Sequence, residues 1–254
     1  MNRNAREQFG RQAEFYAVSR THSHADSLAN ITELAHPQTH QAAVDIGTGP
    51  GFTAFAIAPF VRLAIATDPA LPMLRQAKRL SAERRLDNIQ LALLVGEALP
   101  FADGSLDLVT CRQAFHHFTE LNKAISEIHR TLKPGGTLVL GDTISPENND
   151  IARWLDDIER RRDPTHVYNL KVSEWRDLLA SVGFQVGEVA MSYTFLEFGD
   201  WTRRSAIPEE EVTRLRHDFL TASPGVASHF HIAPSGEKID FTWDAAVIQA
   251  LKPA

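Results

Sequence analysis

The sequence predicts an α/β fold, a doubly wound and mostly parallel sheet of seven strands with helices on both faces. Two observations support this prediction. Short apolar runs alternate with amphipathic segments at helical spacing, a pattern typical of parallel sheets with crossover helices. In addition, a glycine-rich turn joins the first apolar run to a helix. The expected strands are residues 42–46, 63–67, 89–95, 106–111, 137–141, 184–195 and 239–251.

The glycine-rich turn is the most informative stretch. Asp45 stands near the end of the first strand, and Gly47-Thr48-Gly49-Pro50-Gly51 follows before a helix that begins at Phe52. Glycines at such a turn reach positive φ angles and let a ligand approach the backbone. The N-terminus of the next helix offers free N–H groups that suit an anion. We therefore expect a nucleotide-like ligand here, with Asp45 placed to hold the ammonium of an amino-acid ligand.

The spacing of the glycines bears on the identity of this ligand. A dinucleotide fingerprint reads G-x-G-x-x-G. Phe52 stands where its third glycine belongs, which disfavours a nicotinamide dinucleotide without excluding it. Asp68 ends the second strand, at the interval where an acidic side chain meets ribose hydroxyls in nucleotide-binding units. An ordinary strand-to-helix turn is the less favoured interpretation, because it does not account for the glycines, Asp45 and Asp68 together.

The segment before this core reads as helical. Residues 5–35 have apolar side chains at helix spacing, with a His-rich break, and predict an N-terminal helical cap over residues 1–38. Such a cap is either a packing element or a lid over the ligand, and Tyr16 is its most interesting aromatic residue. The cofactor-binding core is expected over residues 41–145.

Helices interrupt the alternation in the last part of the chain. A charged amphipathic helix is expected over residues 149–162, and another over 174–181 with Ser173 as N-cap and Gly183 at its end. Residues 199–222 predict a helical insertion before the last strand. We expect residues 146–254 to wall a substrate pocket within a single domain of residues 1–254.

Composition and charge limit the classes of function. The chain has 254 residues, with 43% hydrophobic and 23% charged residues, a composition typical of a soluble globular protein. A formal charge of −6 and a pI near 6.0 give no basic field for nucleic acid, which is therefore not an expected partner. The single cysteine, Cys111, excludes an internal disulfide and a multi-cysteine metal site.

Signals for targeting, membrane insertion and metal binding are not expected either. The polar N-terminus lacks an apolar signal core, and the most apolar stretch is broken by Pro59 and Arg62. His22 and His24 lack carboxylate or cysteine partners at ligand spacing, so no metal is predicted. We expect a cytoplasmic protein with no membrane span, whose oligomeric state, a homodimer included, the sequence leaves open.

Six motifs follow one another in order along the chain. They are Val44 to Gly51, Asp68 with Met73-Leu74, Glu97-Ala98-Leu99-Pro100-Phe101, Asp107-Leu108-Val109, His116-His117-Phe118 and Leu132-Lys133-Pro134-Gly135-Gly136. This ordered set resembles the class I S-adenosylmethionine-dependent methyltransferases, and within them the subgroup around the ubiquinone/menaquinone-biosynthesis C-methyltransferases. The resemblance covers roughly residues 8–145.

The resemblance implies a Rossmann-like methyltransferase fold with S-adenosyl-L-methionine as cofactor. It also implies which residues contact that cofactor, at the ends of the first four strands and in the cap. They are Tyr16, Asp45, Gly47, Thr48, Gly49, Asp68, Pro69, Met73, Gly96, Glu97, Ala98, Cys111 and Arg112.

Each of these residues has an implied role. The turn and Asp45 would hold the amino-acid end of the cofactor. Asp68 would accept hydrogen bonds from the ribose hydroxyls, and Pro69 and Met73 would line the adenine. Many family members carry an aspartate where Val95 stands here, so adenine contacts are expected from the backbone of residues 96–98. Cys111 and Arg112 would touch the methionine portion through their backbone.

Three histidines are candidates for a catalytic base. A sulfonium is a good leaving group, so positioning and exclusion of water supply much of the rate, and a base is needed only for an acceptor that must lose a proton. Histidine titrates near neutrality, which suits this role. We rank His117 first because it follows the fourth strand, then His166 on a loop able to close, then His116. One of the adjacent pair is expected to be a packed, hydrogen-bonded residue.

The sequence thus predicts methyl transfer to a small, aromatic or quinone-like acceptor, at carbon, oxygen or nitrogen. The alternative is a cofactor-binding protein of the same fold that transfers no methyl group, such as a pericyclase, an isomerase or a ligand sensor. A nicotinamide oxidoreductase and a tRNA methyltransferase are disfavoured by the glycine spacing and the acidic balance.

Overall fold

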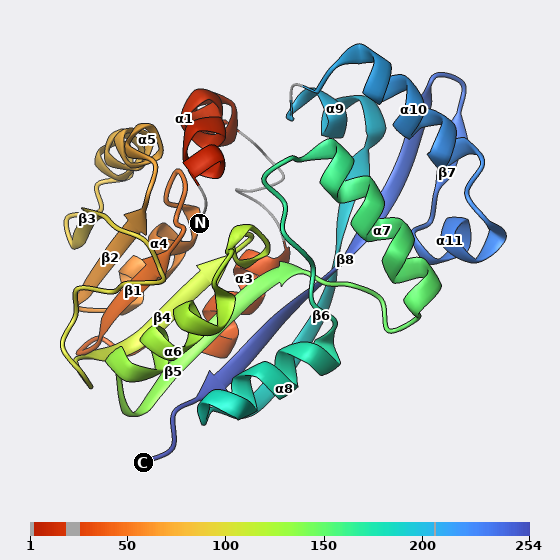
Figure 1. The fold of residues 1–254 in the computed structure, drawn as a ribbon. Helices are drawn as coiled ribbons and strands as arrows, with labels where there is room; N and C mark the ends of the chain where they lie inside the picture. Colours follow the sequence, from red (N-terminus) through yellow and green to blue (C-terminus); the bar gives the residue numbers. More distant parts are fainter. Residues whose placement is uncertain (1–2, 19–25, 206) are drawn as a thin grey trace.

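The computed structural model describes residues 3–18, 26–205 and 207–254. Its centre is a sheet with strand order β3-β2-β1-β4-β5-β8-β6, and a short β7 pairs with β8 (Figure 1). Strands β1 to β5 are parallel, and β8 is antiparallel to both β5 and β6. This confirms the predicted doubly wound, mostly parallel sheet. The strands are β1 (Ala42–Ile46), β2 (Leu63–Asp68), β3 (Ile89–Leu93), β4 (Leu106–Arg112), β5 (Leu132–Thr143), β6 (Gln185–Glu197), β7 (Ala233–Ser235) and β8 (Lys238–Leu251).

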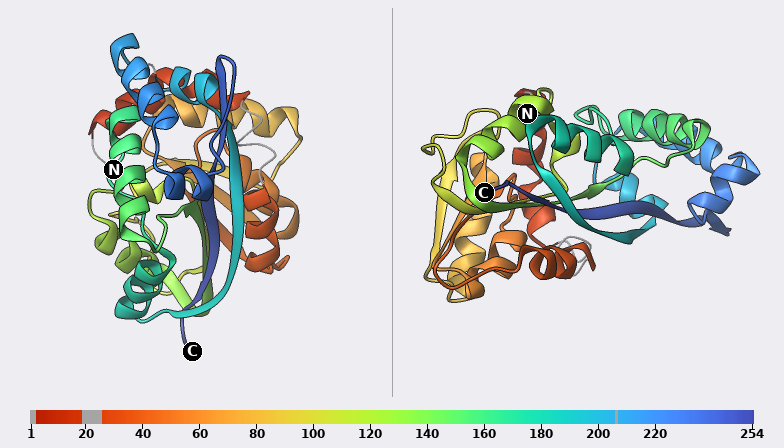
Figure 2. Two further views of the ribbon diagram at one scale, coloured as in Figure 1. Left: turned by 90° about the vertical axis from the view of Figure 1, so that its right-hand side faces the viewer. Right: turned by 90° about the horizontal axis from the view of Figure 1, so that it is seen from below.

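Helices cover both faces of the sheet (Figure 2). Apolar side chains of α3, α4 and α5 pack on one face, and those of α6 and α8 pack on the other. The helices are α1 (Arg3–Ala17), α3 (Asp26–Ala35), α4 (Phe52–Ile57), α5 (Leu71–Glu83), α6 (Leu121–Thr131), α7 (Asn149–Arg162), α8 (Val172–Val182), α9 (Phe198–Arg203), α10 (Glu209–Leu220) and α11 (Pro224–His229), with 3-10 turns η1 (Ala58–Phe60) and η2 (Phe115–His117).

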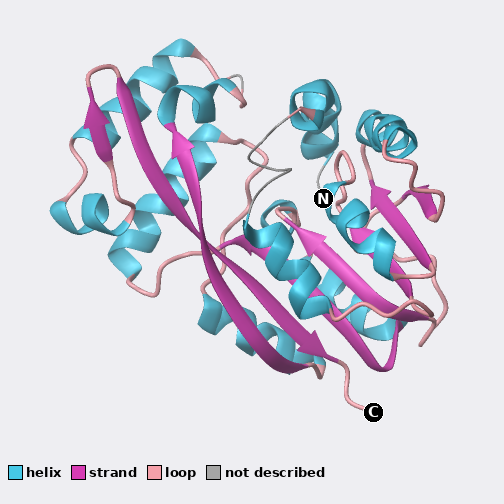
Figure 3. Ribbon diagram, turned by 180° about the vertical axis from the view of Figure 1, so that it is seen from behind, coloured by secondary structure: helices cyan, strands magenta, loops and turns pink. Residues whose placement is uncertain are grey.

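Strands β6 and β8 continue well beyond the rest of the sheet, and α7, α9, α10 and α11 pack on this extension (Figures 1 and 3). We call these four helices and the extended parts of β6 and β8 the distal lobe. It has its own apolar core, in which aromatic rings such as Phe219, Phe241 and Trp243 are almost fully buried. Burying one such side chain contributes about 1.5–3 kcal/mol. The lobe is therefore a packed unit that can hold side chains rigidly over the edge of the sheet.

The distal lobe corrects part of the sequence prediction. The predicted helical insertion over residues 199–222 is present as two helices, α9 and α10, and a third helix, α11, follows it. The strand β7 was not predicted, because its three exposed residues have no apolar pattern. It forms a hairpin with β8, in which Ser235 pairs with Lys238 and Ala233 pairs with Asp240.

Of the two predictions for the ends of α8, one is wrong and one is right. The N-cap of α8 is Lys171, not Ser173, since the Glu174 carboxylate accepts from the backbone N–H of Lys171 at 2.9 Å. Ser173 instead donates through its hydroxyl to Glu147 at 2.8 Å. Gly183 ends the helix with a φ of 102°, as predicted.

The fifth strand begins earlier than predicted. It was expected at residue 137, after a break at residues 133–136, but β5 starts at Leu132 directly after α6. Leu132 pairs with Leu106 and Thr137 with Leu108, so the intervening residues bulge out of the ladder. At the other end of the ladder Arg112 pairs with Gly141, so β5 continues two residues beyond β4 to Thr143, which lines the cavity described below.

Candidate active site

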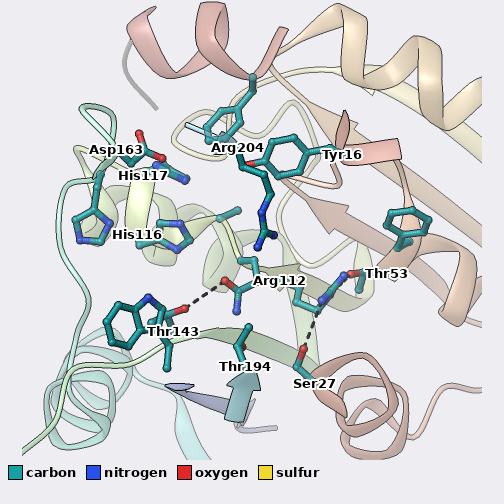
Figure 4. A pocket seen from close by; sticks show the side chains of 18 of the residues that line it. Tyr16, Ser27, Thr53, Arg112, His116, His117, Thr143, Asp163, Thr194 and Arg204 are labelled. Atoms are coloured by element: carbon teal, nitrogen blue, oxygen red, sulfur yellow. Dashed lines mark hydrogen bonds between the residues drawn. The ribbon is translucent and has the colours of Figure 1, made fainter. Parts of the chain in front are cut away.

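A cavity lies at the carboxyl ends of β1, β2, β4 and β5, where the sheet meets the distal lobe. This edge is where open α/β sheets bind ligands. The first helix, α1, contributes Phe9 and Tyr16 to the lining, and α7 and the segment that follows α9 contribute Arg162 and Arg204. Figure 4 shows Tyr16 beside Arg204, with the histidines on another side of the cavity.

The glycine-rich turn forms one wall of the cavity. Gly47 and Gly49 have φ angles of 65° and 53°, which favour glycine. A Cβ added at Gly47 would lie 2.7 Å from Cβ of Ala114, whereas one at Gly49 would meet nothing within 4 Å. Gly47 is therefore required for packing, and the backbone at Gly49 faces open space in the cavity. Thr48 fixes the turn by donating its backbone N–H to Thr67 O at 2.9 Å.

Asp68, at the end of β2, ties this turn to the next one. Its Oδ2 accepts from Gly49 N at 3.0 Å, and its Oδ1 accepts from Ala70 N at 2.8 Å. The side chain lines the cavity and is 6% exposed. Burial raises the pKa of Asp68 to about 6. Since a carboxylate oxygen accepts more than one hydrogen bond, Asp68 retains acceptor capacity for a ligand hydroxyl.

Asp45 lies behind the turn and does not line the cavity. Its Oδ2 accepts from the Thr48 hydroxyl at 2.5 Å and its Oδ1 from the Thr110 hydroxyl at 2.7 Å. Burial raises its pKa to about 6. In this arrangement the carboxylate holds the turn in shape and adds negative charge behind it.

The other residues predicted to contact a cofactor fall into two groups. Tyr16, Thr48, Met73 and Arg112 line the cavity together with the two glycines and Asp68. The others do not line it, and their contact with a cofactor stays a prediction; they are Asp45, Pro69, Gly96, Glu97, Ala98 and Cys111. Cys111 is 0% exposed in the apolar core, and burial raises the pKa of its thiol well above its usual value, as expected for a core residue.

Arg112 extends from the end of β4 across the floor of the cavity (Figure 4). Its Nε donates to the Thr53 hydroxyl at 3.1 Å, and its Nη1 donates to the Ser27 hydroxyl at 3.4 Å. Thr53 belongs to α4, the helix that starts after the glycine turn. Arg112 therefore places a positive charge beside the turn.

His116 is held by a carboxylate that the sequence prediction did not identify. Its Nδ1 lies 2.6 Å from Oδ1 of Asp142, near the end of β5, and its backbone N–H donates to Oδ2 of the same residue at 3.2 Å. Asp142 is 2% exposed. Burial lowers the pKa of His116, but the charge and the hydrogen bond of Asp142, with smaller contributions from Glu159 and Asp163, raise it, and the net pKa lies above the usual value for histidine. Because the carboxylate binds Nδ1–H, the Nε2 atom is the one that can take up a proton.

His117 and His166 are in different surroundings. Nδ1 of His117 lies 3.2 Å from both the carbonyl and the hydroxyl oxygen of Thr165, and its ring packs edge-on against Phe9. Burial, together with the neighbouring His116, lowers the pKa of His117 to about 3, and the same causes lower that of His166 to about 2. Both members of the adjacent pair are therefore hydrogen-bonded, and His117 is the more deeply buried of the two.

The loop that carries His166 has buried polar atoms without partners. Nε2 of His166 and both amide atoms of Asn169 are buried and make no hydrogen bond with the described residues. Both side chains line the cavity. Buried polar groups are almost always hydrogen-bonded, so these atoms indicate a place for a ligand or water.

The sequence prediction missed several of these residues. Asp142 follows an apolar strand as Asp68 does, and that position was an available signal. Asn169 and Arg204 lie outside the matched motifs, and only the tertiary arrangement brings them to the cavity together with Arg162.

Two features are absent from the described part of the chain. None of its helices is long and apolar enough to cross a membrane. It contains no group of three or more histidine, cysteine, aspartate or glutamate residues arranged to hold a metal ion. His22 and His24 lie outside the described residues.

The parallel sheet, the glycine turn and Asp68 define a protein that binds a nucleotide-like cofactor, and comparison with known proteins gives its family. Residues 44–140 match the family described as Methyltransferase domain. The chain is 29% identical to the uncharacterised methyltransferase YcgJ of Bacillus subtilis over 250 residues, which cover 96% of this chain and 97% of the relative. It is 33% identical over 208 residues to the uncharacterised protein YafE of Escherichia coli, covering 82% of this chain and 99% of the relative.

Further comparisons agree with this assignment. The crystal structure of YcgJ has a TM-score of 0.86 at 29% identity, covering 91% of this chain and 100% of that one. The ubiquinone/menaquinone biosynthesis C-methyltransferase UbiE of Rubrivivax gelatinosus is 31% identical over 125 residues, 49% of this chain and 45% of the relative. The chain belongs to the class I S-adenosylmethionine-dependent methyltransferases, and its cofactor is S-adenosyl-L-methionine.

The residues of the cavity fit this cofactor. The open backbone at Gly49 leaves room for its amino-acid end, and Asp68 offers acceptor oxygens for ribose hydroxyls. Met73 adds an apolar surface suited to adenine. These are the residues that would hold the cofactor, next to the charge of Arg112.

Proposed function

We propose that this protein transfers the methyl group of S-adenosyl-L-methionine to a small-molecule acceptor with an aromatic or quinone-like body, and that His116 is the catalytic base. In this proposal, residues 41–145 bind the cofactor, while the cap at residues 1–38 and residues 146–254 enclose the acceptor. The observation that carries the proposal is the 2.6 Å contact between Nδ1 of His116 and Oδ1 of Asp142 at the cavity.

His116 is better suited to act as a base than the two other histidines. A general base is most effective when its pKa lies near the working pH. Asp142 raises the pKa of His116, whereas His117 and His166 have pKa values of about 3 and about 2. Those two rings remain neutral near pH 7 and take up a proton poorly. We therefore propose His116 as the base in place of His117, which the sequence ranked first.

The bound cofactor would supply a methyl group attached to a sulfonium sulfur. Once the methyl group is transferred, that sulfur is part of a neutral thioether. An acceptor X–H would donate its proton to Nε2 of His116 as the X–CH₃ bond forms, and Asp142 would stabilise the imidazolium. The lobe and α1 would exclude water and align the acceptor, which supplies much of the rate in such reactions. Trp201, Trp243 and Phe9 provide an aromatic lining that suits a flat acceptor.

The test is transfer of a labelled methyl group from S-adenosylmethionine into a small-molecule extract, with His116→Gln and His217→Gln compared. His217 is exposed on α10, so its variant controls for loss of a histidine. We expect His116→Gln to lower the rate about 10²–10⁴-fold and the control to retain it. Full activity of His116→Gln would contradict its role as the base.

A further inference from the structure

Two arginines of the distal lobe line the cavity and are near enough for their charges to repel each other. Arg162 is the last residue of α7 and Arg204 directly follows α9. Both line the cavity, and their side chains are only 14% and 17% exposed. Burying a charged guanidinium group costs free energy of folding unless an anion pairs with it.

The described residues satisfy Arg162 poorly. Its Nε and Nη2 donate to Trp201 O at 3.4 Å, and the nearest carboxylates, Glu159 and Asp163, lie 3.8 Å and 3.9 Å away. Those two distances exceed hydrogen-bond length. Both carboxylates also have other partners. Oε1 of Glu159 accepts from Trp243 at 2.6 Å, and Oδ1 of Asp163 accepts from the Thr165 hydroxyl at 2.7 Å.

The hydrogen bonds of the Arg204 guanidinium are also incomplete. Its Nε donates to Asp200 O at 3.3 Å, and its Nη2 lies 3.4 Å from the Asp200 carboxylate, which is 56% exposed. A guanidinium has five N–H donors, so most donors of both arginines have no acceptor among the described residues. Burial lowers the pKa of Arg204, and the charge of Arg162 lowers it further. An anion between them would relieve this repulsion.

Aromatic side chains lie next to both arginines. Cζ of Arg162 lies 5.2 Å from the centre of the Trp201 ring, which keeps the guanidinium in place. Tyr16 lies beside Arg204 (Figure 4). Arg112, which lies beside the glycine turn, is the guanidinium on the cofactor side, whereas Arg162 and Arg204 both come from the lobe.

We propose that Arg162 and Arg204 bind a carboxylate or phosphate group of the methyl acceptor, so that the acceptor is an organic acid or a phosphate ester. This inference rests on the proposed function, and it names the class of substrate. Guanidinium groups bind both anions with paired hydrogen bonds. The anionic group anchors the acceptor at the lobe, and the atom that accepts the methyl group lies elsewhere on the molecule, toward His116.

The experiment measures binding of four probes to the full chain saturated with S-adenosylhomocysteine. Benzoate and phenyl phosphate carry the anion, and benzamide and benzyl alcohol are neutral counterparts of similar size. Calorimetry should show that an anion binds at least about tenfold more tightly than its neutral counterpart. Arg204→Met and Arg162→Met should remove this preference.

Arg203→Met is the matched control, because Arg203 is next in the chain, is 76% exposed and also pairs with Asp200. It should bind the probes as the wild type does. Arg204→Lys keeps a charge and should retain part of the anion preference, which distinguishes loss of binding from loss of fold. Affinity for S-adenosylhomocysteine should stay within about twofold in all variants.

Three results would overturn the proposal. The first is equal binding of neutral and anionic probes, and the second is unchanged anion binding in both Met variants. The third is loss of S-adenosylhomocysteine affinity in those variants, which would assign the arginines to the carboxylate of the cofactor. Anion binding without methyl transfer to any acceptor would instead contradict the proposed function alone.

Discussion

Asp142 and His116 form a pair between the end of β5 and the segment that follows β4. Oδ1 of Asp142 lies 2.6 Å from Nδ1 of His116 and also accepts from Thr143 N at 2.9 Å. Val167 N donates to His116 O at 2.8 Å, so the loop before α8 is fixed to the same place. Strand end, histidine and loop therefore form one connected side of the cavity.

The first prediction concerns this pair. Asp142 raises the pKa of His116 because its negative charge stabilises the imidazolium. Asp142→Asn removes that charge, so the pKa of His116 should fall. The acidic limb of the profile of kcat/KM against pH should then move to lower pH, and the plateau should drop because the ring is less well oriented. If the acidic limb of the profile does not move in Asp142→Asn, a group other than His116 is responsible for it.

The second prediction concerns the glycine turn. Gly49→Val places a β-branched side chain at a φ of 53° and in the space that faces the cavity. We expect S-adenosylhomocysteine affinity to fall more than in Asp68→Ala, which should lose about 1.5–3 kcal/mol as charge-assisted hydrogen bonds disappear. Calorimetry on variants with a native circular dichroism spectrum measures this. Wild-type affinity in Gly49→Val would exclude the turn from the cofactor site.

The third prediction is a pH dependence of cofactor affinity. Burial raises the pKa of both Asp45 and Asp68 to about 6. Ionised Asp68 is the better acceptor for ribose hydroxyls, so affinity for S-adenosylhomocysteine should weaken as the pH falls below about 6. Asp68→Asn should weaken this dependence, because one titrating group is gone. Constant affinity from about pH 5 to about pH 8 would contradict the assignment.

The same two carboxyl groups affect stability with a defined sign. Between about pH 4 and about pH 6 the folded chain binds more protons at these sites than the unfolded chain. Their contribution to the free energy of unfolding is therefore largest below this window and decreases as the pH rises through it. Chemical denaturation of Asp68→Asn and the wild type at both ends of the window measures the contribution of Asp68.

The fourth prediction concerns the loop before α8. Both amide atoms of Asn169 are buried at the cavity and have no hydrogen-bond partner in the described part of the chain, so we expect them to bind the acceptor. Asn169→Leu should raise KM for the acceptor about tenfold or more, because its polar group loses a partner, and should leave S-adenosylhomocysteine affinity unchanged. An unchanged KM would show that water occupies this position.

The sequence predicted the sheet and the cofactor edge well because both depend on local patterns. Apolar runs mark the strands, the glycines mark the turn that follows β1, and Asp68 marks the end of β2. The base and the arginines depend on long-range packing. Asp142 meets His116 because β5 pairs with β4 and extends past its end, and Arg204 reaches the cavity because β6 and β8 extend into the lobe.

The central claim, methyl transfer, is tested most directly by counting products. The wild-type enzyme is given S-adenosylmethionine labelled in its methyl group, together with the acceptor, and mass spectrometry quantifies labelled product and S-adenosylhomocysteine. We predict one labelled methyl group in the product for each S-adenosylhomocysteine formed. Conversion of the acceptor with no label incorporated and no S-adenosylhomocysteine formed would contradict methyl transfer and would identify a protein that retains the cofactor for another purpose.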